Sequence, residues 1–233
     1  SNYDKSRNFA DSYRNEQLVH RLPNRHVFLP SGGARQNRQD GCVDRLASEV
    51  TPMNLEQRVA HVEERIRAAC ARSGRPREDV RLIAVTKYVS LETTRRLMEL
   101  GCSHIGENRW QDAAGKWEAL QGAGTWHFLG TLQTNKVKDV VGKFAYIHSL
   151  DRLSLAKEIE KRAARQGIRV DCFIQVNVSG EQTKHGIAPD ELPDFAREVS
   201  NCEHLRVVGL MTMAPHVEDA EQTRPVFREL RRL

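Results

Sequence analysis

The sequence has no pair of cysteines at the CxxC spacing and no long hydrophobic run. Its five cysteines, at positions 42, 70, 102, 172 and 202, are scattered. They indicate neither a disulfide framework nor a zinc site, and we expect a reducing, cytoplasmic setting. No apolar run approaches the roughly 18 residues of a membrane span, and the first residues do not resemble a secretory signal. We therefore expect no membrane partner.

Several catalytic and binding motifs are also absent. There is no P-loop, GxGxxG, HExxH or GxSxG motif, and His185 and His216 each stand alone, so no metal site is predicted. The net charge is +5, but the 36 basic residues are spread along the chain and balanced by 31 acidic ones. This is weak evidence for nucleic acid, and no nucleic-acid partner is expected. Hydrophobic residues make up 39% of the chain, which excludes a collagen-like or wholly disordered protein.

Residues 1–52 differ in composition from the rest of the chain. Apolar residues are sparse there, and the stretch 31–40 has neither helical nor strand periodicity. Such a segment buries too little apolar surface to offset its chain entropy, so we expect a disordered leader. The alternative is a short folded extension around Val27, Phe28 and Leu29.

From residue 53 onward, short apolar runs alternate with amphipathic stretches. Asn54 and Gln57 have the spacing of a helical capping box, and Gly74 is expected to end that first helix. The expected strands are Leu82–Val85, His104–Ile105, Trp126–Leu129, Tyr146–His148, Cys172–Val178 and Val207–Met211. The expected helices cover 91–100, 108–120, 134–142, 151–166 and 189–200, and another begins near 218, where Pro225 kinks or restarts it.

This alternation predicts parallel strands covered by helices, as in a doubly wound sheet or a (β/α)8-type TIM barrel. A complete eight-unit barrel usually takes about 250 residues, and residues 53–233 supply six units. We therefore expect two parts, a leader over 1–52 and an incomplete barrel over 53–233.

In such folds functional side chains gather at the carboxyl ends of the strands. Lys87 ends the first strand, where a partly buried amine could attack an aldehyde, although a solvated lysine is the simpler interpretation. His127, between Trp126 and Phe128, could be a ligand or a packed core histidine. Asn108 and Asn177 could bind a ligand, although helix capping is favoured for Asn108.

The remaining candidates follow the same strand ends. Met211 fits best as a residue packed inside the barrel. Asn135, like Asn108, is favoured as a helix cap. Lys184 lies in a polar loop, where a solvated lysine is the default.

Six motifs in order resemble the pyridoxal phosphate homeostasis protein family, also called the proline synthase co-transcribed proteins. The resemblance covers residues 53–233. The motifs are Leu82-Ile83-Ala84-Val85-Thr86-Lys87, Gly106-Glu107-Asn108, Trp126-His127-Phe128-Leu129-Gly130 with Leu132-Gln133-Thr134-Asn135-Lys136, Gln175-Val176-Asn177, Lys184-His185-Gly186 and Gly209-Leu210-Met211.

The resemblance implies a barrel like the N-terminal domain of alanine racemase, with pyridoxal 5′-phosphate bound as an internal aldimine on Lys87. Candidate cofactor-binding residues are Lys87, Asn108, His127, Asn177 and Met211. The resemblance implies a protein that buffers or delivers the cofactor, with apo-enzymes that depend on pyridoxal 5′-phosphate as its partners. It also implies a monomer without catalytic activity. The family's phosphate-holding turn and the arginine facing the pyridine nitrogen would follow residue 233.

A racemase-type enzyme is the alternative. Relatives that racemise alanine use a catalytic tyrosine, and Tyr88 is the candidate nearest to Lys87 in this sequence. Adjacent residues at a strand end are expected to point to opposite faces, which would make Tyr88 a poor partner base.

Overall fold

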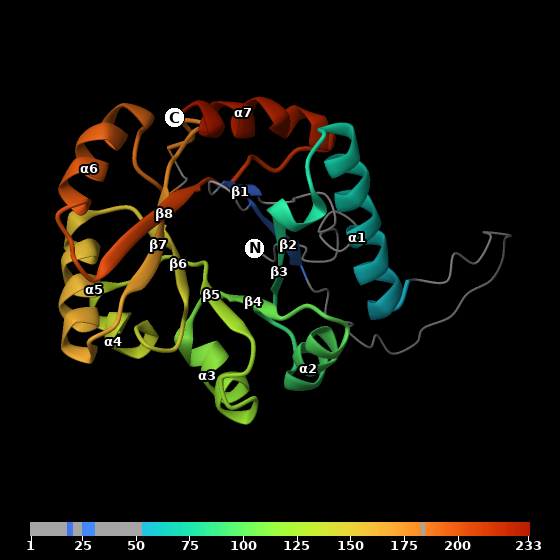
Figure 1. Ribbon diagram of the computed structural model, residues 1–233, viewed down its shortest axis with the longest axis horizontal. Helices are drawn as coiled ribbons and strands as arrows, with labels where there is room; N and C mark the ends of the chain where they lie inside the picture. Colours follow the sequence, from blue (N-terminus) through green and yellow to red (C-terminus); the bar gives the residue numbers. More distant parts are fainter. Residues whose placement is uncertain (1–17, 21–24, 31–52, 183–184) are drawn as a thin grey trace, which may run out of the picture.

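A closed barrel of eight strands forms the centre of the molecule (Figure 1). The computed structural model describes residues 18–20, 25–30, 53–182 and 185–233. Neighbouring strands pair in sequence order, and β1 closes the ring against β8. The strands are β1 (Leu18–His20), β2 (Arg25–Pro30), β3 (Val80–Val85), β4 (His104–Glu107), β5 (Thr125–Phe128), β6 (Tyr146–Leu150), β7 (Val170–Gln175) and β8 (Leu205–Met211).

The strands from β3 to β8 confirm the prediction of six β/α units. All pairs from β2 to β8 are parallel, as the alternation of strands and helices requires. Short 3₁₀ turns precede β3, α4, α6 and α7. The helices are α1 (Leu55–Arg72), α2 (Leu91–Glu99), α3 (Trp110–Ala119), α4 (Val137–Val140), α5 (Leu153–Gln166), α6 (Leu192–Val199) and α7 (Arg224–Arg232).

Local signals in the sequence set several helix ends. The backbone N–H of Gln57 donates to Asn54 Oδ1 at 2.8 Å, and the Asn54 N–H donates to Gln57 Oε1 at 3.0 Å, so the expected capping box is present. Gly167 ends α5 in the left-handed conformation, with φ of 62°. Pro225 lies in the first turn of α7, where its missing N–H costs nothing, and so it starts the helix rather than kinking it.

The prediction of a leader without regular structure over residues 1–52 is wrong for two segments. β2 pairs in parallel with β3 along all six of its residues, and β1 pairs antiparallel with both β2 and β8. The folded alternative around Val27–Leu29 is the one found, since these residues lie in β2. The barrel therefore draws strands from both sides of the expected boundary at residue 53, and the rest of 1–52 lies outside the described residues.

The physical reason lies in the backbone rather than in composition. Six parallel strands leave two open edges, on β3 and on β8, each with a row of unpaired N–H and C=O groups. Strand pairing satisfies these groups through main-chain hydrogen bonds, which any residue except proline can donate. A segment poor in apolar residues can therefore complete a sheet. The apolar content averaged over residues 1–52 does not indicate the short strand β2 within them.

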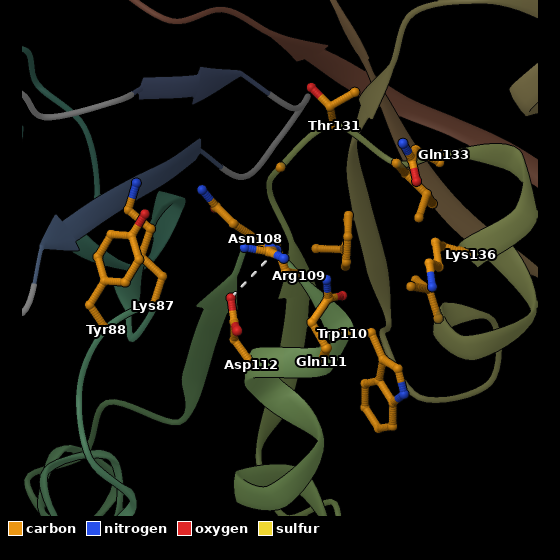
Figure 2. Close-up of a pocket in the computed structure, with 14 residues that line it drawn as sticks. Lys87, Tyr88, Asn108, Arg109, Trp110, Gln111, Asp112, Thr131, Gln133 and Lys136 are labelled. Carbon is orange, nitrogen blue, oxygen red and sulfur yellow. Dashed lines mark ion pairs between the residues drawn. The ribbon is translucent and has the colours of Figure 1, made fainter.

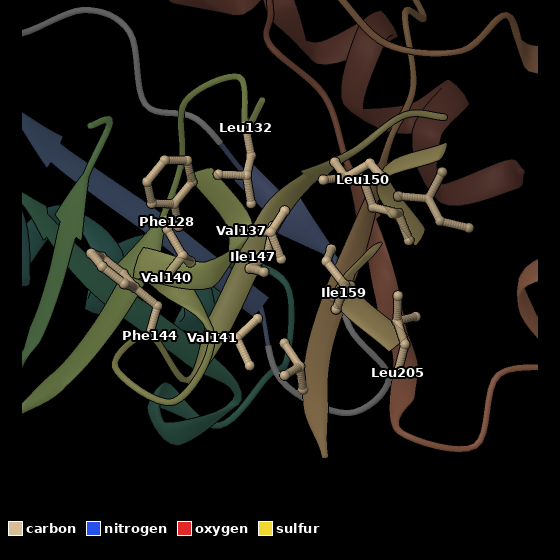
Figure 3. Close-up of a cluster of buried hydrophobic side chains, with 14 of the residues drawn as sticks. Phe128, Leu132, Val137, Val140, Val141, Phe144, Ile147, Leu150, Ile159 and Leu205 are labelled. Atoms are coloured by element: carbon tan, nitrogen blue, oxygen red, sulfur yellow. The ribbon is translucent and has the colours of Figure 1, made fainter. Parts of the chain in front are cut away.

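Most of the hydrophobic core lies between the strands and the covering helices (Figure 3). Trp126 and Phe128 of β5 and Phe144 before β6 pack edge to face, with ring centroids 5.3 to 6.2 Å apart. Helix α1 covers the outer face of β3 through a smaller cluster of Val62, Ile66, Cys70 and Val80.

A second core fills the barrel itself. Its buried apolar residues are Ile83, Leu129, Phe173 and Met211, one from each of four strands or strand ends. Gly106 of β4 lies among them, and a Cβ built there would come 2.6 Å from Leu129 Cδ1. Among the described residues the interior is therefore packed rather than hollow at this level.

Candidate functional site

A pocket of about 410 Å³ opens at the carboxyl ends of β3, β4 and β5 (Figure 2). This volume falls within the roughly 300–1,000 Å³ of typical small-molecule sites. The segments after the three strands form its walls, and α3 begins beside it. The lining residues are Lys87, Tyr88, Asn108, Arg109, Trp110, Gln111, Asp112, Phe128, Gly130, Thr131, Leu132, Gln133, Lys136 and Val140.

Lys87 lies in a tight turn directly after β3. The backbone N–H of Val89 donates to the carbonyl of Thr86 at 3.1 Å, so Lys87 and Tyr88 are the two central residues of the turn. The Lys87 side chain is partly buried, and its Nζ lies 5.5 Å from the centroid of the Tyr88 ring. Among the described residues, Lys87 Nζ has no hydrogen bond and no ion pair. The amine is therefore available to a ligand in the pocket.

Tyr88 differs from the expectation for a strand end. Its φ is 74°, a left-handed conformation, and its side chain is highly exposed. Alternation of faces applies within a strand, whereas Lys87 and Tyr88 lie past its end in a turn, and both line the pocket (Figure 2). The expectation that the two side chains point to opposite faces is therefore wrong.

Asn108 follows β4 and lies beside Lys87 at the pocket (Figure 2). The favoured capping role is wrong, because α3 has Arg109 as its N-cap residue and no side-chain cap. The chain after β5 comes very close here, since a Cβ built on Gly130 would be 2.5 Å from the Asn108 carbonyl oxygen. Glycine at position 130 thus permits the approach that shapes this wall.

Two further cationic groups line the pocket. Arg109 forms an ion pair with Asp112 at 3.7 Å, and Lys136 is exposed at the opposite wall. With Lys87, these residues place three basic side chains around one small cavity. The expected cap Asn135 lies in the 3₁₀ turn Thr134–Lys136, whose N-cap residue is Gln133. The basic side chains around the pocket favour an anionic ligand, and the Lys87 amine favours one that also presents a group able to react with it.

His127 lies inside the barrel and is not among the residues that line the pocket. It is fully buried, and each of its ring nitrogens is within hydrogen-bond distance of another histidine: His104 Nδ1 at 2.9 Å and His148 Nε2 at 2.8 Å. Its ring stacks on Tyr146 with centroids 4.7 Å apart. Of the two alternatives that the sequence left open for His127, the structure shows the packed core histidine. Its ring is the middle one of a row of three imidazoles.

The surroundings of these three imidazoles disfavour a positive charge on His104. Burial, with a smaller effect of the Arg81 guanidinium, lowers the pKa of His104 from 6.5 to about 4. His104 is therefore neutral at physiological pH, and a neutral ring can accept or donate one hydrogen bond to His127.

Asn177 and Met211 also lie away from the pocket. The Asn177 side chain organises its own loop: its Nδ2 donates to the Glu181 carbonyl at 2.9 Å, and its Oδ1 accepts from the Gly180 N–H at 3.2 Å. Met211 is buried in the barrel interior. The pocket therefore brings together Lys87 and Asn108, and it does not include His127, Asn177 or Met211. Lys184 lies outside the described residues.

Sequence reasoning missed the polar wall of Arg109, Gln111, Thr131 and Gln133. Gln133 stands in one of the quoted motifs but was given no role, and the residue types of the other three do not distinguish a ligand-binding side chain from a solvated one. It also missed the buried pair of Glu107 and Lys116 beneath the Lys87 turn. Among the described residues, no cluster of three histidine, cysteine or acidic side chains could hold a metal ion. None of the described helices has the length and apolar character needed to cross a membrane.

Comparison with protein-family models matches residues 58–233 to the alanine racemase N-terminal domain. A pyridoxal phosphate homeostasis protein from Aquifex aeolicus is 44% identical over 182 residues, covering 78% of this chain and 80% of the relative. A protein of the same name from Pseudomonas aeruginosa is 34% identical, covering 77% and 78%.

Solved structures agree with these matches. A protein of unknown function from Bifidobacterium adolescentis has a TM-score of 0.69 at 34% identity, covering 75% of each chain. PipY from Synechococcus elongatus, solved with pyridoxal phosphate bound, has a TM-score of 0.58 at 32% identity, covering 73% of this chain and 82% of PipY. Alanine racemase from Corynebacterium glutamicum, at 12% identity and a TM-score of 0.51, shares the fold.

Proposed function

Because this chain belongs to the family of pyridoxal phosphate homeostasis proteins, we propose that it binds pyridoxal 5′-phosphate through Lys87 and buffers or delivers this cofactor. The observation that carries the proposal is the Lys87 amine, held in the pocket beside Asn108 without a hydrogen bond or ion pair to any described residue. The bound cofactor of PipY supports the same ligand class.

The residues at the pocket fit this cofactor. When bound, pyridoxal 5′-phosphate supplies an aldehyde that condenses with a lysine amine with loss of one water, and it carries a phosphate dianion. Lys87 provides the amine, Asn108 provides an amide donor and acceptor, and Lys136 provides a positive charge that offsets part of the dianion. The set contains no carboxylate except Asp112, which Arg109 neutralises.

We further propose that the chain is a carrier rather than an enzyme. Its relatives in Aquifex and Pseudomonas are named for homeostasis and not for a reaction. A carrier needs a reversible covalent hold, which a lysine in an open pocket provides. The cytoplasmic setting, the monomeric state and transfer to apo-enzymes that depend on this cofactor belong to the same proposal.

One observation bears on the racemase alternative. The Tyr88 ring lies at the pocket next to Lys87, and a phenol in that place could exchange a proton with a bound amino acid. The Tyr88 side chain is highly exposed, however, so the pocket does not enclose it. A carrier predicts no interconversion of D- and L-alanine, whereas a racemase predicts turnover that Tyr88→Phe abolishes.

Absorbance titration tests the proposed function. After unbound pyridoxal 5′-phosphate is removed, the chain should retain a visible band, and Lys87→Arg should not, because a guanidinium stays protonated at any usable pH. Lys157→Arg, at an exposed position on α5, is the matched control and should behave as the unaltered chain does. A full band in Lys87→Arg would contradict the proposal.

A further inference from the structure

Beneath the Lys87 turn lies a buried ion pair that the proposed function leaves unused. Lys116 of α3 contacts Glu107 Oε1 at the end of β4, with the two side chains 10% and 0% exposed. A buried pair of this kind contributes little net stability, because both charges lose their hydration. A lysine in this place therefore calls for an explanation beyond pairing with a carboxylate.

The three acceptors around the Lys116 ammonium point to its role. An ammonium has three N–H donors. Here Nζ donates to Glu107 Oε1, to the Thr86 carbonyl at 2.7 Å and to the Val89 carbonyl at 3.3 Å. Thr86 and Val89 are the first and last residues of the turn that carries Lys87, so the ammonium spans both ends of that turn.

Glu107 holds the same turn from its other side. The Thr86 hydroxyl donates to Glu107 Oε1 at 2.7 Å, and the Thr86 N–H donates to the Gly106 carbonyl at 2.9 Å. Thr86 is fully buried, and its side chain, N–H and carbonyl are all bonded. The start of the turn is thus fixed to the end of β4.

The turn needs such support because its conformation is strained. Tyr88 has a φ of 74°, which costs a non-glycine residue roughly 1–2 kcal/mol. Its side chain is exposed and gains little packing energy to offset that cost. The polar contacts of Thr86 and Val89 are what hold the conformation, and the direction of the Lys87 side chain depends on it.

We propose that Lys116 and Glu107 are positioning residues that hold the Thr86–Val89 turn and thereby present the Lys87 amine to the aldehyde of pyridoxal 5′-phosphate. The inference rests on the proposed function for its ligand, and on the contacts of the turn for its mechanism. Neither residue lines the pocket: Lys116 acts through the carbonyls of Thr86 and Val89, and Glu107 acts through the Thr86 hydroxyl and through Lys116.

The test compares two variants with a control. Lys116→Met removes the two carbonyl contacts and leaves Glu107 buried without its partner charge. Lys116→Met combined with Glu107→Gln removes both charges while the Gln oxygen can still accept from Thr86. Lys157→Met, at an exposed position on α5, is the matched control. If Lys116→Met does not fold, the double variant carries the test.

Two measurements are made on each protein. Hydrogen exchange of the segment 86–90 without cofactor reports whether the turn is held. Absorbance titration with pyridoxal 5′-phosphate reports the affinity. We expect the double variant to melt near the unaltered chain, yet to exchange this segment about 10-fold faster and to bind about 10-fold more weakly. The loss of the two carbonyl contacts, partly offset because two charges no longer lose their hydration, predicts changes of this size.

The outcomes separate the two proposals. If the double variant keeps both the protection of segment 86–90 and the affinity of the unaltered chain, Lys116 and Glu107 are only structural and the inference is overturned. If the unaltered chain takes up no cofactor, the proposed function fails, while hydrogen exchange still decides whether Lys116 holds the turn.

Discussion

Tyr88 is a single residue whose backbone conformation controls the candidate site. With φ at 74° and its side chain 86% exposed, its substitutions report backbone strain with little contribution from packing. Asparagine tolerates this conformation, whereas a β-branched residue does not. We expect Tyr88→Val to lower the free energy of unfolding by about 1–2 kcal/mol and Tyr88→Asn to leave it nearly unchanged. Urea unfolding of both variants checks this, and equal effects would show that the turn is not strained.

His104 is a second residue with a measurable consequence. Its pKa, about 4 in the folded chain, lies below the 6.5 of an unperturbed histidine because of burial and, to a smaller extent, Arg81. Between pH 4 and 6.5 the unfolded chain binds a proton on His104 that the folded chain does not bind. The contribution of His104 to the free energy of unfolding is therefore complete above pH 6.5 and is lost as the pH falls toward 4. His104→Asn should flatten the pH dependence of the melting temperature in this window.

The control for this prediction is His61→Asn, which removes an exposed imidazole from α1. It should leave the pH dependence between 4 and 6.5 as it is in the unaltered chain. If the two variants behave alike, the buried histidine chain is not a source of acid sensitivity.

For single residues, the sequence predicted that Lys87 lies at a strand end, but it did not predict the turn conformation around Lys87. The motif indicates a lysine after a buried strand, whereas the turn with the positive φ of Tyr88 is contacted at both ends by Lys116, from a helix later in the chain. His127 shows the same limit. Its partners, His104 and His148, become neighbours only when β4, β5 and β6 pair side by side.

At the scale of elements, the approach of the segments after β4 and β5 is set by Gly130. Gly130→Ala would place a methyl group 2.5 Å from the Asn108 carbonyl oxygen, so the backbone must move. We expect a loss of about 1–3 kcal/mol in the free energy of unfolding together with weaker cofactor binding, because Asn108 lines the pocket. Thermal unfolding and absorbance titration measure the two effects.

The matched control is Gly115→Ala in the middle of α3, where the new methyl group meets no atom within 4 Å. Alanine there should raise stability by about 0.5–1 kcal/mol, because glycine is a poor helix former. If Gly130→Ala were as harmless as Gly115→Ala, the close approach at Asn108 would not exist.

Elements were predictable where one local pattern decides them. Each strand from β3 to β8 begins within two residues of its predicted start, and the capping box of α1 is present as expected. The stretch 134–142 was predicted as one helix but is a 3₁₀ turn followed by the four-residue α4. Asn108 was favoured as a cap because of its residue type, yet α3 begins one residue later, with Arg109 as N-cap.

At the scale of the whole molecule, β1 and β2 complete the ring between β8 and β3. Deleting residues 1–30 removes both strands and leaves the backbone edges of β3 and β8 without partners. We expect the melting temperature to fall by several degrees and the shortened chain to aggregate as its concentration rises. Differential scanning calorimetry and light scattering check both effects.

A shorter deletion provides the control. Removing residues 1–15 leaves β1 and β2 in place and should preserve the melting temperature. If deletion of residues 1–30 is equally harmless, the ring closure by β1 and β2 contributes nothing to stability.

The barrel architecture was predictable from the alternation of strands and helices, but the closure of the ring was not. Periodicity identifies strands that bury one or both faces, whereas β1 has only three residues and β2 six, in a segment whose average composition indicates disorder. β1 and β2 close the barrel by pairing with the open edges of β8 and β3. No local sequence pattern indicates this pairing, because it depends on the other six strands.

Every proposal about the pocket depends on the attachment of pyridoxal 5′-phosphate to Lys87. The most direct measurement is to load the chain with the cofactor, make the attachment permanent with borohydride, digest the protein and locate the label by mass spectrometry. We expect a label on Lys87, absent in Lys87→Arg, with Lys116 unlabelled because its amine is buried and bonded. A label on Lys136 or Lys184 with Lys87 unmodified would contradict it.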